Sequence, residues 1–417
     1  MFIETQRQKI TALYNDYPPK FWTLLAITFV DRLGGSLLFP FFALYLTKRF
    51  NVGMTQVGLL FLVWSLTSFV GSMLGGALTD RFGRKWIVIF SLVSTSFSSV
   101  VMGLVGSLQA FFVLALVVGV FTEVGGPAYQ AMVADLLPAE KRAQGYGLFR
   151  VTFNLSIVIG PAIGGFLATR SYLLLFISDA VISLISAVLV AVYLPETKPE
   201  AIEGAEPESV AGTFAGYIQV LHDRVFMLFL LTCMLMVFVY MNMNTTLGVY
   251  LRDVHGVPES GYGLILSLNA LMVVLFQFPI TRRIEGKPQM LMMALGMALY
   301  TIGFSMYGLV SIYPLFLLAM VIITIGEMLV APVSQALTAQ LAPEDMRGRY
   351  MAVFGVSWGL PFAIGPILAG LVMDKLNPTW LWYIAGLLGI MATSGFLGLH
   401  RLVGEQLVNA EATAAGD

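Results

Sequence analysis

The chain has 417 residues, of which 58% are hydrophobic and only 11% are charged, and its formal net charge is −1. Soluble domains carry about 25% charged residues, whereas the mean hydropathy of this chain is +0.84. These values exclude an ordinary soluble protein. The net charge alone says nothing about nucleic acid, but the sequence has no basic tail, and no nucleic-acid partner is expected. The single cysteine, Cys233, also excludes an intrachain disulfide and a metal site built from cysteines.

The N-terminal segment, residues 1–20, is polar and of mixed charge, and it lacks the apolar core of a cleaved signal peptide. We expect it to form a short cytoplasmic helix that leads into the first span. Because a span needs about 20 apolar residues, the sequence then predicts twelve transmembrane helices, over residues 21–47, 54–79, 86–105, 110–135, 143–169, 172–194, 224–252, 258–282, 289–309, 313–339, 347–374 and 379–402.

The longest connection, residues 195–223, opens with proline and acidic residues and predicts a cytoplasmic linker. The predicted fold is all-α, with two pseudo-symmetric six-helix bundles: an N-terminal half (1–194), a C-terminal half (224–402) and a cytoplasmic tail (403–417). Lys and Arg concentrate on the side that holds both termini, so the positive-inside rule places both termini in the cytoplasm. We expect a multi-pass protein of the plasma membrane, which in a bacterium is the inner membrane.

The two halves repeat each other at one constant offset. Residues 127–161 and residues 332–366 both begin and end with proline, and they lie 205 residues apart. The same offset pairs Gln130 with Gln335 and Pro138 with Pro343. A gapless offset over this length indicates duplicated six-helix repeats, an architecture typical of transporters.

Four charged residues interrupt the apolar spans at depth. Asp31 and Arg32 lie side by side in the first span, Glu123 lies in the fourth and Glu327 lies in the tenth. A charge at the bilayer centre costs about 2.5–3.5 kcal/mol on insertion scales, so such residues face a protein or water-filled interior. We expect all four to line a central cavity, with the carboxylates as proton carriers or cation-binding groups. The alternatives are a static ion pair for Asp31 and a neutral, hydrogen-bonded acid for each glutamate.

Several uncharged residues within the spans are further candidates for this cavity. Hydrogen bonds or aromatic surface would come from Asn154, Tyr240, Asn242, Asn244, Asn269, Gln277 and Trp358, and ordinary helix packing is the alternative for each. A weaker candidate is Asp179, which lies about seven residues from the end of its span, where a side chain reaches the interface or pairs locally.

The segment GALTDRFGRK, residues 76–85, matches in full the signature G-x-x-x-D-R-x-G-R-K found between the second and third spans of the major facilitator superfamily. The chain resembles that superfamily over nearly its whole length. The resemblance implies that this loop latches one conformational state and that Arg84 pairs with the acidic residue ending span 4, Asp135. The latch residues it implies are Gly76, Asp80, Arg81, Gly83, Arg84, Lys85 and Asp135. The matching loop of the second half keeps only Glu285 at the Asp80 position, so the latch is one-sided.

Two further segments resemble drug:proton antiporters of this superfamily. In span 5, Gly160, Pro161, Gly164 and Gly165 match the antiporter motif G-x-x-x-G-P-x-x-G-G, and Ser156 replaces its first glycine. The alternative for this segment is a kinked, closely packed helix. The stretch around Glu327 resembles the tenth span of LmrP- and MdtH-like multidrug transporters, in which an embedded glutamate matters for coupling and ligand binding. The arginine that often occurs in span 4 of the family is missing here.

These observations predict a secondary active transporter that exports lipophilic or cationic compounds in exchange for protons by alternating access. No nucleotide-binding loop of the type G-x-x-x-x-G-K-[ST] occurs, so the proton gradient is the expected energy source and no cofactor is expected. The expected partners are a small-molecule substrate, protons and membrane lipid, with the protein acting as a monomer and not as an enzyme. The alternatives are a proton-coupled or facilitative transporter of a specific metabolite, such as a sugar or amino acid, and an intramembrane hydrolase.

Overall fold

The computed structural model describes residues 15–198, 219–343 and 346–414, although the side chains of residues 403–414 and of a few internal positions, Asp80 among them, are not described. Most of the expected N-terminal helix and most of the linker therefore lie outside what the structure describes, whereas most of the expected tail continues the last helix, α18 (Trp380–Ala414). Every described element is a helix, and twelve helical segments are long and apolar enough to cross a membrane. The prediction of an all-α fold with twelve spans is confirmed.

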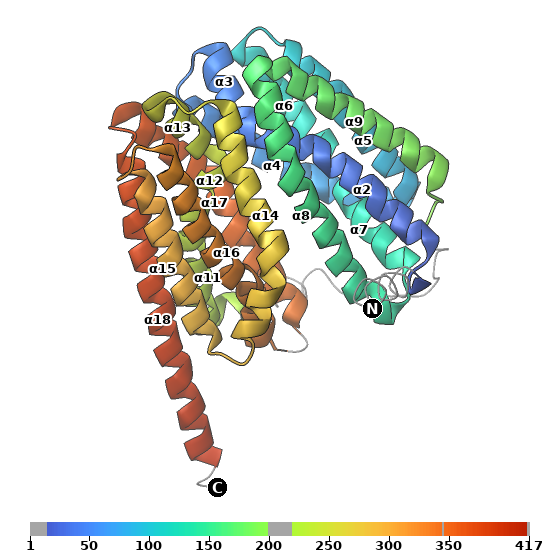
Figure 1. The fold of residues 1–417 in the computed structure, drawn as a ribbon. Coiled ribbons are helices and arrows are strands. Elements are labelled where there is room, and N and C mark those ends of the chain that lie inside the picture. The colour runs from blue at the N-terminus through green and yellow to red at the C-terminus, as the bar shows by residue number, and fades with distance from the viewer. Residues whose placement is uncertain (1–14, 199–218, 344–345, 415–417) are drawn as a thin grey trace, which may run out of the picture. The chain divides into compact units, whose positions relative to one another are not determined.

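The first six spans comprise α2 (Pro19–Leu38), η1 (Phe39–Phe41), α3 (Phe42–Phe50), α4 (Met54–Phe82), α5 (Arg84–Leu104), α6 (Leu108–Glu123), α7 (Gly125–Leu136), α8 (Ala139–Arg170) and α9 (Tyr172–Tyr193). The second six comprise α11 (Arg224–Tyr240), α12 (Asn242–Thr245), α13 (Leu247–His255), α14 (Glu259–Ile284), α15 (Gln289–Tyr307), α16 (Tyr313–Leu341), α17 (Arg347–Lys375) and α18 (Trp380–Ala414). Figure 1 shows the first set in blue to green and the second in yellow-green to red.

The first span of each half is interrupted at an equivalent place. The 3-10 turn η1 contains Pro40, which has no N–H for a helical hydrogen bond. The offset of 205 residues carries this turn to residues 244–246, where α12 ends and α13 begins. There the side chains of Asn242 and Thr245 bond to backbone carbonyls of the same span. Irregular backbone inside an apolar layer needs such internal partners.

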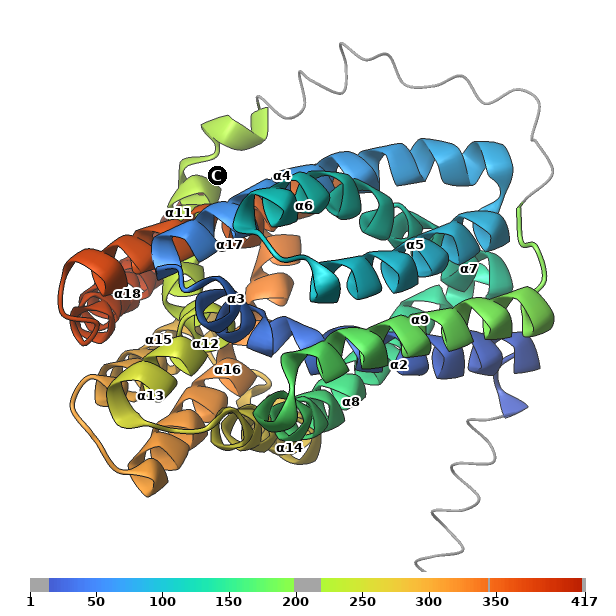
Figure 2. The ribbon, with the colours of Figure 1, turned by 90° about the horizontal axis from the view of Figure 1, so that it is seen from above.

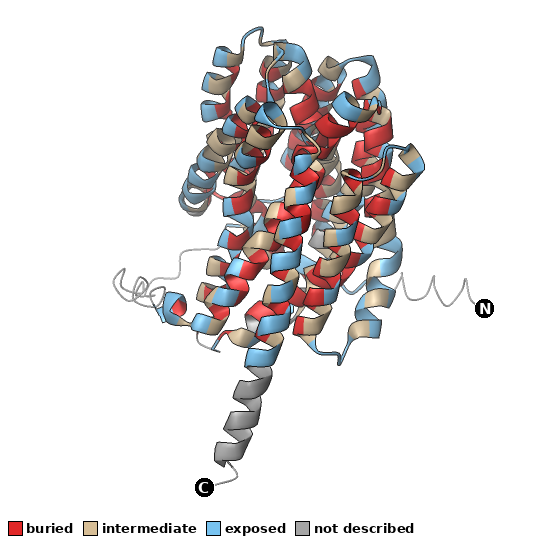
Figure 3. Cartoon of the chain, turned by 90° about the vertical axis from the view of Figure 1, so that its left-hand side faces the viewer, coloured by how far each residue is buried: buried red, intermediate tan, exposed pale blue. Residues whose placement is uncertain are grey.

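The described residues form two compact units, one of residues 15–42 and 63–198 and the other of residues 43–62, 219–343 and 346–414. In the first unit, α2 packs against α8 and α9, and α5 packs against α9 and α7 (Figure 2). In the second unit, α15 packs against α16 and α18, and α11 packs against α17 and α18. Exposed positions recur along the outer faces of the helices (Figure 3) and include large apolar side chains such as Phe97 and Phe278, as expected for surfaces that meet lipid.

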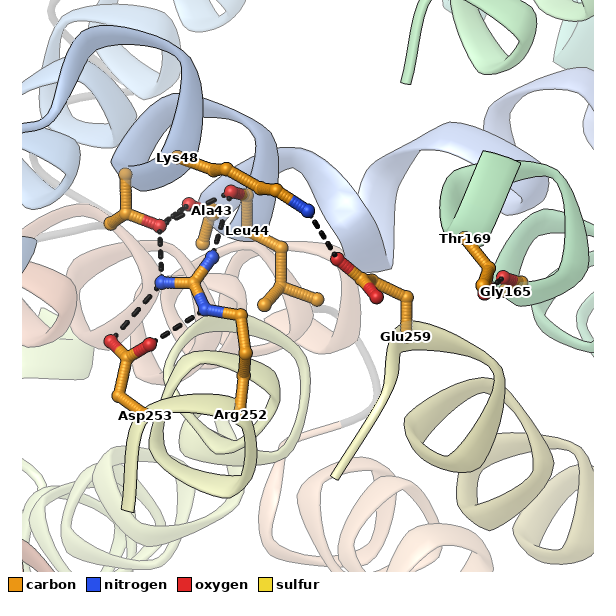
Figure 4. A network of polar contacts seen from close by, with 9 residues as sticks. Ala43, Leu44, Lys48, Gly165, Thr169, Arg252, Asp253 and Glu259 are labelled. Atoms are coloured by element: carbon orange, nitrogen blue, oxygen red, sulfur yellow. Dashed lines mark hydrogen bonds and ion pairs between the residues drawn. The ribbon is translucent and has the colours of Figure 1, made fainter. Parts of the chain in front are cut away.

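Residues 43–62 belong to the second unit by packing, although by sequence they lie in the first half. Arg252 of α13 donates hydrogen bonds to the Leu44 carbonyl (3.1 Å) and to Thr47 Oγ1 (3.0 Å), and it also pairs with Asp253 (Figure 4). Lys48 Nζ lies 3.4 Å from Glu259 Oε1 in the same network. These bonds join the end of the first span to α13 and α14.

Asp374, near the end of α17, makes a second connection to this segment. Its carboxylate accepts hydrogen bonds from the backbone N–H groups of Met54 and Thr55, both at 2.8 Å, and so caps the N-terminus of α4. Close packing accompanies the cap, because a Cβ atom at Gly370 would lie 2.5 Å from the backbone of Met54. The unit boundary therefore follows contacts that the sequence halves do not reveal.

Candidate functional site

Glu327 lies in α16 at the centre of a hydrogen-bonded group of the second unit. Tyr240 Oη donates to Glu327 Oε1 (3.0 Å), and Asn269 Nδ2 donates to Glu327 Oε2 (2.7 Å). Asn269 also donates to Thr324 Oγ1 (3.0 Å), which lies one turn before Glu327 in α16. Both carboxylate oxygens are thus held in place, while Glu327 itself remains only half-buried.

Two further aromatic rings pack against Tyr240, the tyrosine that is bonded to Glu327. Tyr240 stacks with Tyr300 of α15 at 5.8 Å between ring centroids, and the Trp358 ring of α17 meets Tyr240 edge-on, also at 5.8 Å. Trp358 remains 36% exposed, so part of its face is open. We call the six residues Tyr240, Asn269, Tyr300, Thr324, Glu327 and Trp358 the Glu327 cluster. A carboxylate among aromatic rings attracts organic cations by charge and by cation–π contact.

The sequence located four of the six residues of this cluster. Glu327, Tyr240, Asn269 and Trp358 were candidates, whereas Tyr300 and Thr324 were not, because nothing in their own segments separates them from packing residues. Asn244, which was also a candidate, lies half-buried in α12 and makes no hydrogen bond to the cluster.

In the first unit, Asp31 and Arg32 of α2 form only a loose pair. Arg32 Nε lies 3.9 Å from Asp31 Oδ2, and the guanidinium also lies over the Phe153 ring at 5.7 Å from its centroid. The Arg32 side chain is 39% exposed and that of Asp31 is 14% exposed. The geometry therefore leaves the Asp31 carboxylate without a close, two-point partner.

Two other acids act electrostatically on Asp31. Glu123 is the last residue of α6 and is exposed, and Asp179 of α9 is buried; each interacts by charge with Asp31. Asn154 is half-buried in α8 of the same unit. The structure thus brings three acids of the first unit into one electrostatic neighbourhood. The expectation of one cavity lined by both halves stays a prediction.

The expected pair of charges joins the start of α5 to the end of α7. Arg84 Nε lies 3.1 Å from Asp135 Oδ2, and Arg84 also donates to the Thr79 carbonyl. Gly83 has φ +93°, a backbone conformation that residues other than glycine rarely adopt. Arg81 and Gly76 lie near the C-terminal end of α4, while the side chain of Asp80 lies outside the described part. The role of these residues as a conformational latch stays a prediction.

Glu196, at the start of the linker, contacts the beginning of α5, which the sequence did not predict. Its carboxylate accepts the backbone N–H groups of Arg84 (2.8 Å) and Lys85 (3.2 Å), the first two residues of α5. It therefore caps that helix with a negative charge. Lys85 Nζ in turn donates to the Ala191 carbonyl at the end of α9 (2.7 Å). Glu196 follows a proline in a polar stretch, which gave no signal of this contact.

The glycines of the antiporter-like motif pack α8 against α2. A Cβ atom at Gly160 would clash with Ser36, and one at Gly164 would lie 2.4 Å from the Leu37 carbonyl. Ser36 Oγ also donates to the Ser156 carbonyl at 2.9 Å. Pro161 and Gly165 lie in the same helix, which continues unbroken from Ala139 to Arg170. These contacts favour close helix packing as what the motif does in this chain.

Twelve spans in two helical units, with acids embedded in the spans, define a membrane transporter built from two bundles. The chain belongs to the Major Facilitator Superfamily, whose family model matches residues 24–366 and 244–412. Among solved structures, the nucleoside transporter NupG superposes with a TM-score of 0.77 at 12% identity, covering 92% of this chain and 99% of that one. A POT family transporter in complex with 5-aminolevulinic acid gives 0.75 at 17% identity, covering 93% and 97%. At these identities the likeness shows the fold alone.

Curated relatives are also distant but span most of the chain. A "Na(+), Li(+), K(+)/H(+) antiporter" of Planococcus maritimus is 26% identical over 399 residues, covering 89% of this chain and 93% of its own length. The "Multidrug resistance protein MdtH" of Shigella flexneri is 24% identical over 377 residues, covering 88% and 86%. The chain is therefore a secondary transporter of this superfamily.

Proposed function

We propose that the protein exports lipophilic cations in exchange for protons, by alternating access. The observation that carries this proposal is the Glu327 cluster, in which a half-buried carboxylate stands among the rings of Tyr240, Tyr300 and Trp358. An organic cation would gain an ion pair with Glu327 and cation–π contact with the rings. The similarity to a multidrug resistance protein and to a cation/proton antiporter supports this substrate class.

The single negative charge of Glu327 also explains why the cation would be exchanged for a proton. A single carboxylate holds either a proton or a cationic ligand at low cost, because an unpaired charge in an apolar layer is expensive. Asp31 and Glu123 of the first unit are the other candidate proton carriers. In this proposal the protein lies in the plasma membrane, the bacterial inner membrane, with both termini in the cytoplasm. It acts as a monomer and draws its energy from the proton gradient.

A second candidate function is the exchange of inorganic monovalent cations for protons. It is favoured by the charge interactions of Asp31 with Glu123 and with Asp179 in the first unit, and by the relative named as an antiporter of Na⁺, Li⁺ and K⁺. The two candidates differ in the unit that binds the exported ion. Flux measured with organic and inorganic cations side by side separates them.

The test is proton flux in liposomes that contain the purified protein and a pH-sensitive dye. A proton gradient is imposed, and ethidium, tetraphenylphosphonium or Na⁺ is added to the wild type and to Asp31→Asn, Glu123→Gln and Glu327→Gln. We expect proton movement driven by the organic cations, lost in Glu327→Gln. Proton movement driven only by Na⁺ would favour the second candidate. No proton movement with any cation, from folded protein, would overturn both and lead to a screen of neutral and anionic metabolites.

A further inference from the structure

Asp179 of α9 is the most deeply buried acid among the described side chains of the first unit, and it contacts α2 and α5. It is only 4% exposed, and its Oδ2 accepts a hydrogen bond from the Ser99 hydroxyl of α5. Its Oδ1 faces Gly34 of α2, where a Cβ atom would lie 2.7 Å away. Helix α9 packs against both α2 and α5. Gly34 has no side chain, and the Asp179 carboxylate occupies the space that a side chain would need there.

The charge of Asp179 is not neutralised by a basic side chain. Asp179 makes no ion pair with any described cationic residue. Arg32, the charged neighbour on α2, lies beside Asp31 and over an aromatic ring, and Asp31 itself repels Asp179 by charge. The charged residues of α5 are Arg84 and Lys85 at its first two positions, about 20 Å along the helix from Ser99. A buried carboxylate in this setting requires a positive partner or a proton.

A buried hydroxyl group next to Asp179, that of Ser183, lacks a hydrogen-bond partner among the described residues. Ser183 lies one turn beyond Asp179 on the same face of α9 and is 1% exposed. The two residues are separated by about 6 Å along the helix axis, so one bound ion can touch both side chains. Buried hydroxyls without a partner are rare and costly in folded proteins.

We propose that Asp179, Ser99 and Ser183 form a binding site for a small monovalent cation, Na⁺ or Li⁺, inside the first unit. A carboxylate and two hydroxyls are hard oxygen ligands, which suit such ions. One negative charge balances one monovalent cation, and the described residues contain no group of three or more His, Cys, Asp or Glu side chains that would hold a metal of higher charge. The site is separate from the Glu327 cluster, and it rests on the second candidate function, for which it names the residues that would bind the ion.

The test is direct binding of ²²Na⁺ to the purified full-length protein in detergent, with choline as the replacement ion. We expect saturable binding that Li⁺ displaces, at least about 10-fold weaker in Asp179→Asn, in Ser99→Ala and in Ser183→Ala, where each ten-fold step equals about 1.4 kcal/mol. The matched control is Ser186→Ala. Ser186 is also buried with an unpartnered hydroxyl, but it lies about 10 Å from Asp179 along α9, so its variant keeps wild-type affinity.

The result that overturns the site is absence of ²²Na⁺ binding by folded wild type, or binding that Asp179→Asn, Ser99→Ala and Ser183→Ala all leave unchanged. If Asp179→Asn does not fold, the two serine variants decide alone. Tetraphenylphosphonium binding is measured on the same preparations. Protein that binds the organic cation but not Na⁺ refutes the ion site and leaves organic-cation export standing, and the opposite pattern does the reverse. Na⁺ binding that all three site variants leave unchanged refutes the site but leaves the second candidate function standing.

Discussion

The two units hold their embedded acids in opposite ways. In the second unit, Glu327 receives hydrogen bonds on both oxygens from Tyr240 and Asn269 and has aromatic neighbours. In the first unit, Asp31 has only a loose contact with Arg32 and lies within electrostatic reach of other acids. One carboxylate is therefore fixed in a single geometry, and the other keeps freedom to change its partner.

This difference indicates that the two duplicated halves of a transporter can bind different ligands. The offset between the repeats carries Glu123 to Met328, one position beyond Glu327, so the acids of the fourth and tenth spans are not equivalent. A fixed carboxylate among rings suits recognition of an organic cation, whereas a group of coupled acids suits exchange of protons or small ions. The predictions below test that division.

The largest effect is expected from Glu327→Gln, which removes the charge but keeps the shape and one acceptor. We expect tetraphenylphosphonium to bind about 100-fold more weakly or worse, because an uncompensated buried charge costs about 3–5 kcal/mol. Isothermal titration calorimetry in detergent measures the affinity. The matched control is Asp31→Asn in the first unit, for which we expect a change within about three-fold. A greater loss in Asp31→Asn than in Glu327→Gln would place the ligand in the first unit.

A smaller loss is expected from Trp358→Leu, which removes the open ring but keeps an apolar side chain. Cation–π contact contributes about 0.5–2 kcal/mol depending on desolvation, which corresponds to a loss of roughly 2- to 30-fold. The loss is specific to charge, so the neutral analogue triphenylphosphine oxide should lose less affinity than tetraphenylphosphonium. Equal losses for both ligands would show that Trp358 acts through apolar contact alone.

The sequence predicted the fold, but it predicted the residues of the Glu327 cluster only in part. Transmembrane spans are recognised in the sequence by their length and hydropathy. Embedded acids such as Glu327 are recognised because a charged residue is unusual in an apolar span. Tyr300 and Thr324 do not stand out, since an aromatic ring or a hydroxyl in a span is ordinary. Their membership depends on which helices meet, α15 and α16 with α11, and the repeat pattern does not specify that.

The same reason explains the contacts made by residues far apart in the chain. The pairing of Arg84 with Asp135 followed from a family resemblance, and the two groups lie together in the structure. The cap of α5 by Glu196 and the cap of α4 by Asp374 had no such guide. Each joins a helix start to an acid more than a hundred residues away, so only the packed structure reveals it.

The variant Asp374→Ala tests whether the contacts of residues 43–62 with the second unit stabilise the protein. Loss of the cap removes two hydrogen bonds from the start of α4, and we expect a destabilisation of about 1–2 kcal/mol. Thermal unfolding in detergent measures it as a lower Tm. The matched control is Asp253→Ala, which removes an exposed ion pair with Arg252 and costs about 1 kcal/mol or less. A larger fall in Tm for Asp253→Ala would show that the Arg252 network, and not the cap, holds this segment.

The smallest effect is expected from His255, at the end of α13 and outside the membrane spans. Its ring contacts Phe316 and lies 3.3 Å (Nε2) from the Tyr250 hydroxyl, and partial burial lowers the pKa of its imidazole. The unfolded chain then binds the proton more readily, so this contribution to stability is full above about pH 6.5 and is lost as pH falls through the lowered pKa.

We therefore expect acid to lower the Tm of the wild type slightly more than that of His255→Asn, because the asparagine does not titrate. Thermal unfolding at pH 7.5 and pH 5 compares the two proteins, and the effect is small because the ring is only half-buried. An identical acid response in both would assign the loss of stability to other groups. The variant also serves the transport assay, since any pH dependence of flux that it retains arises from the acids of the spans and not from unfolding of α13.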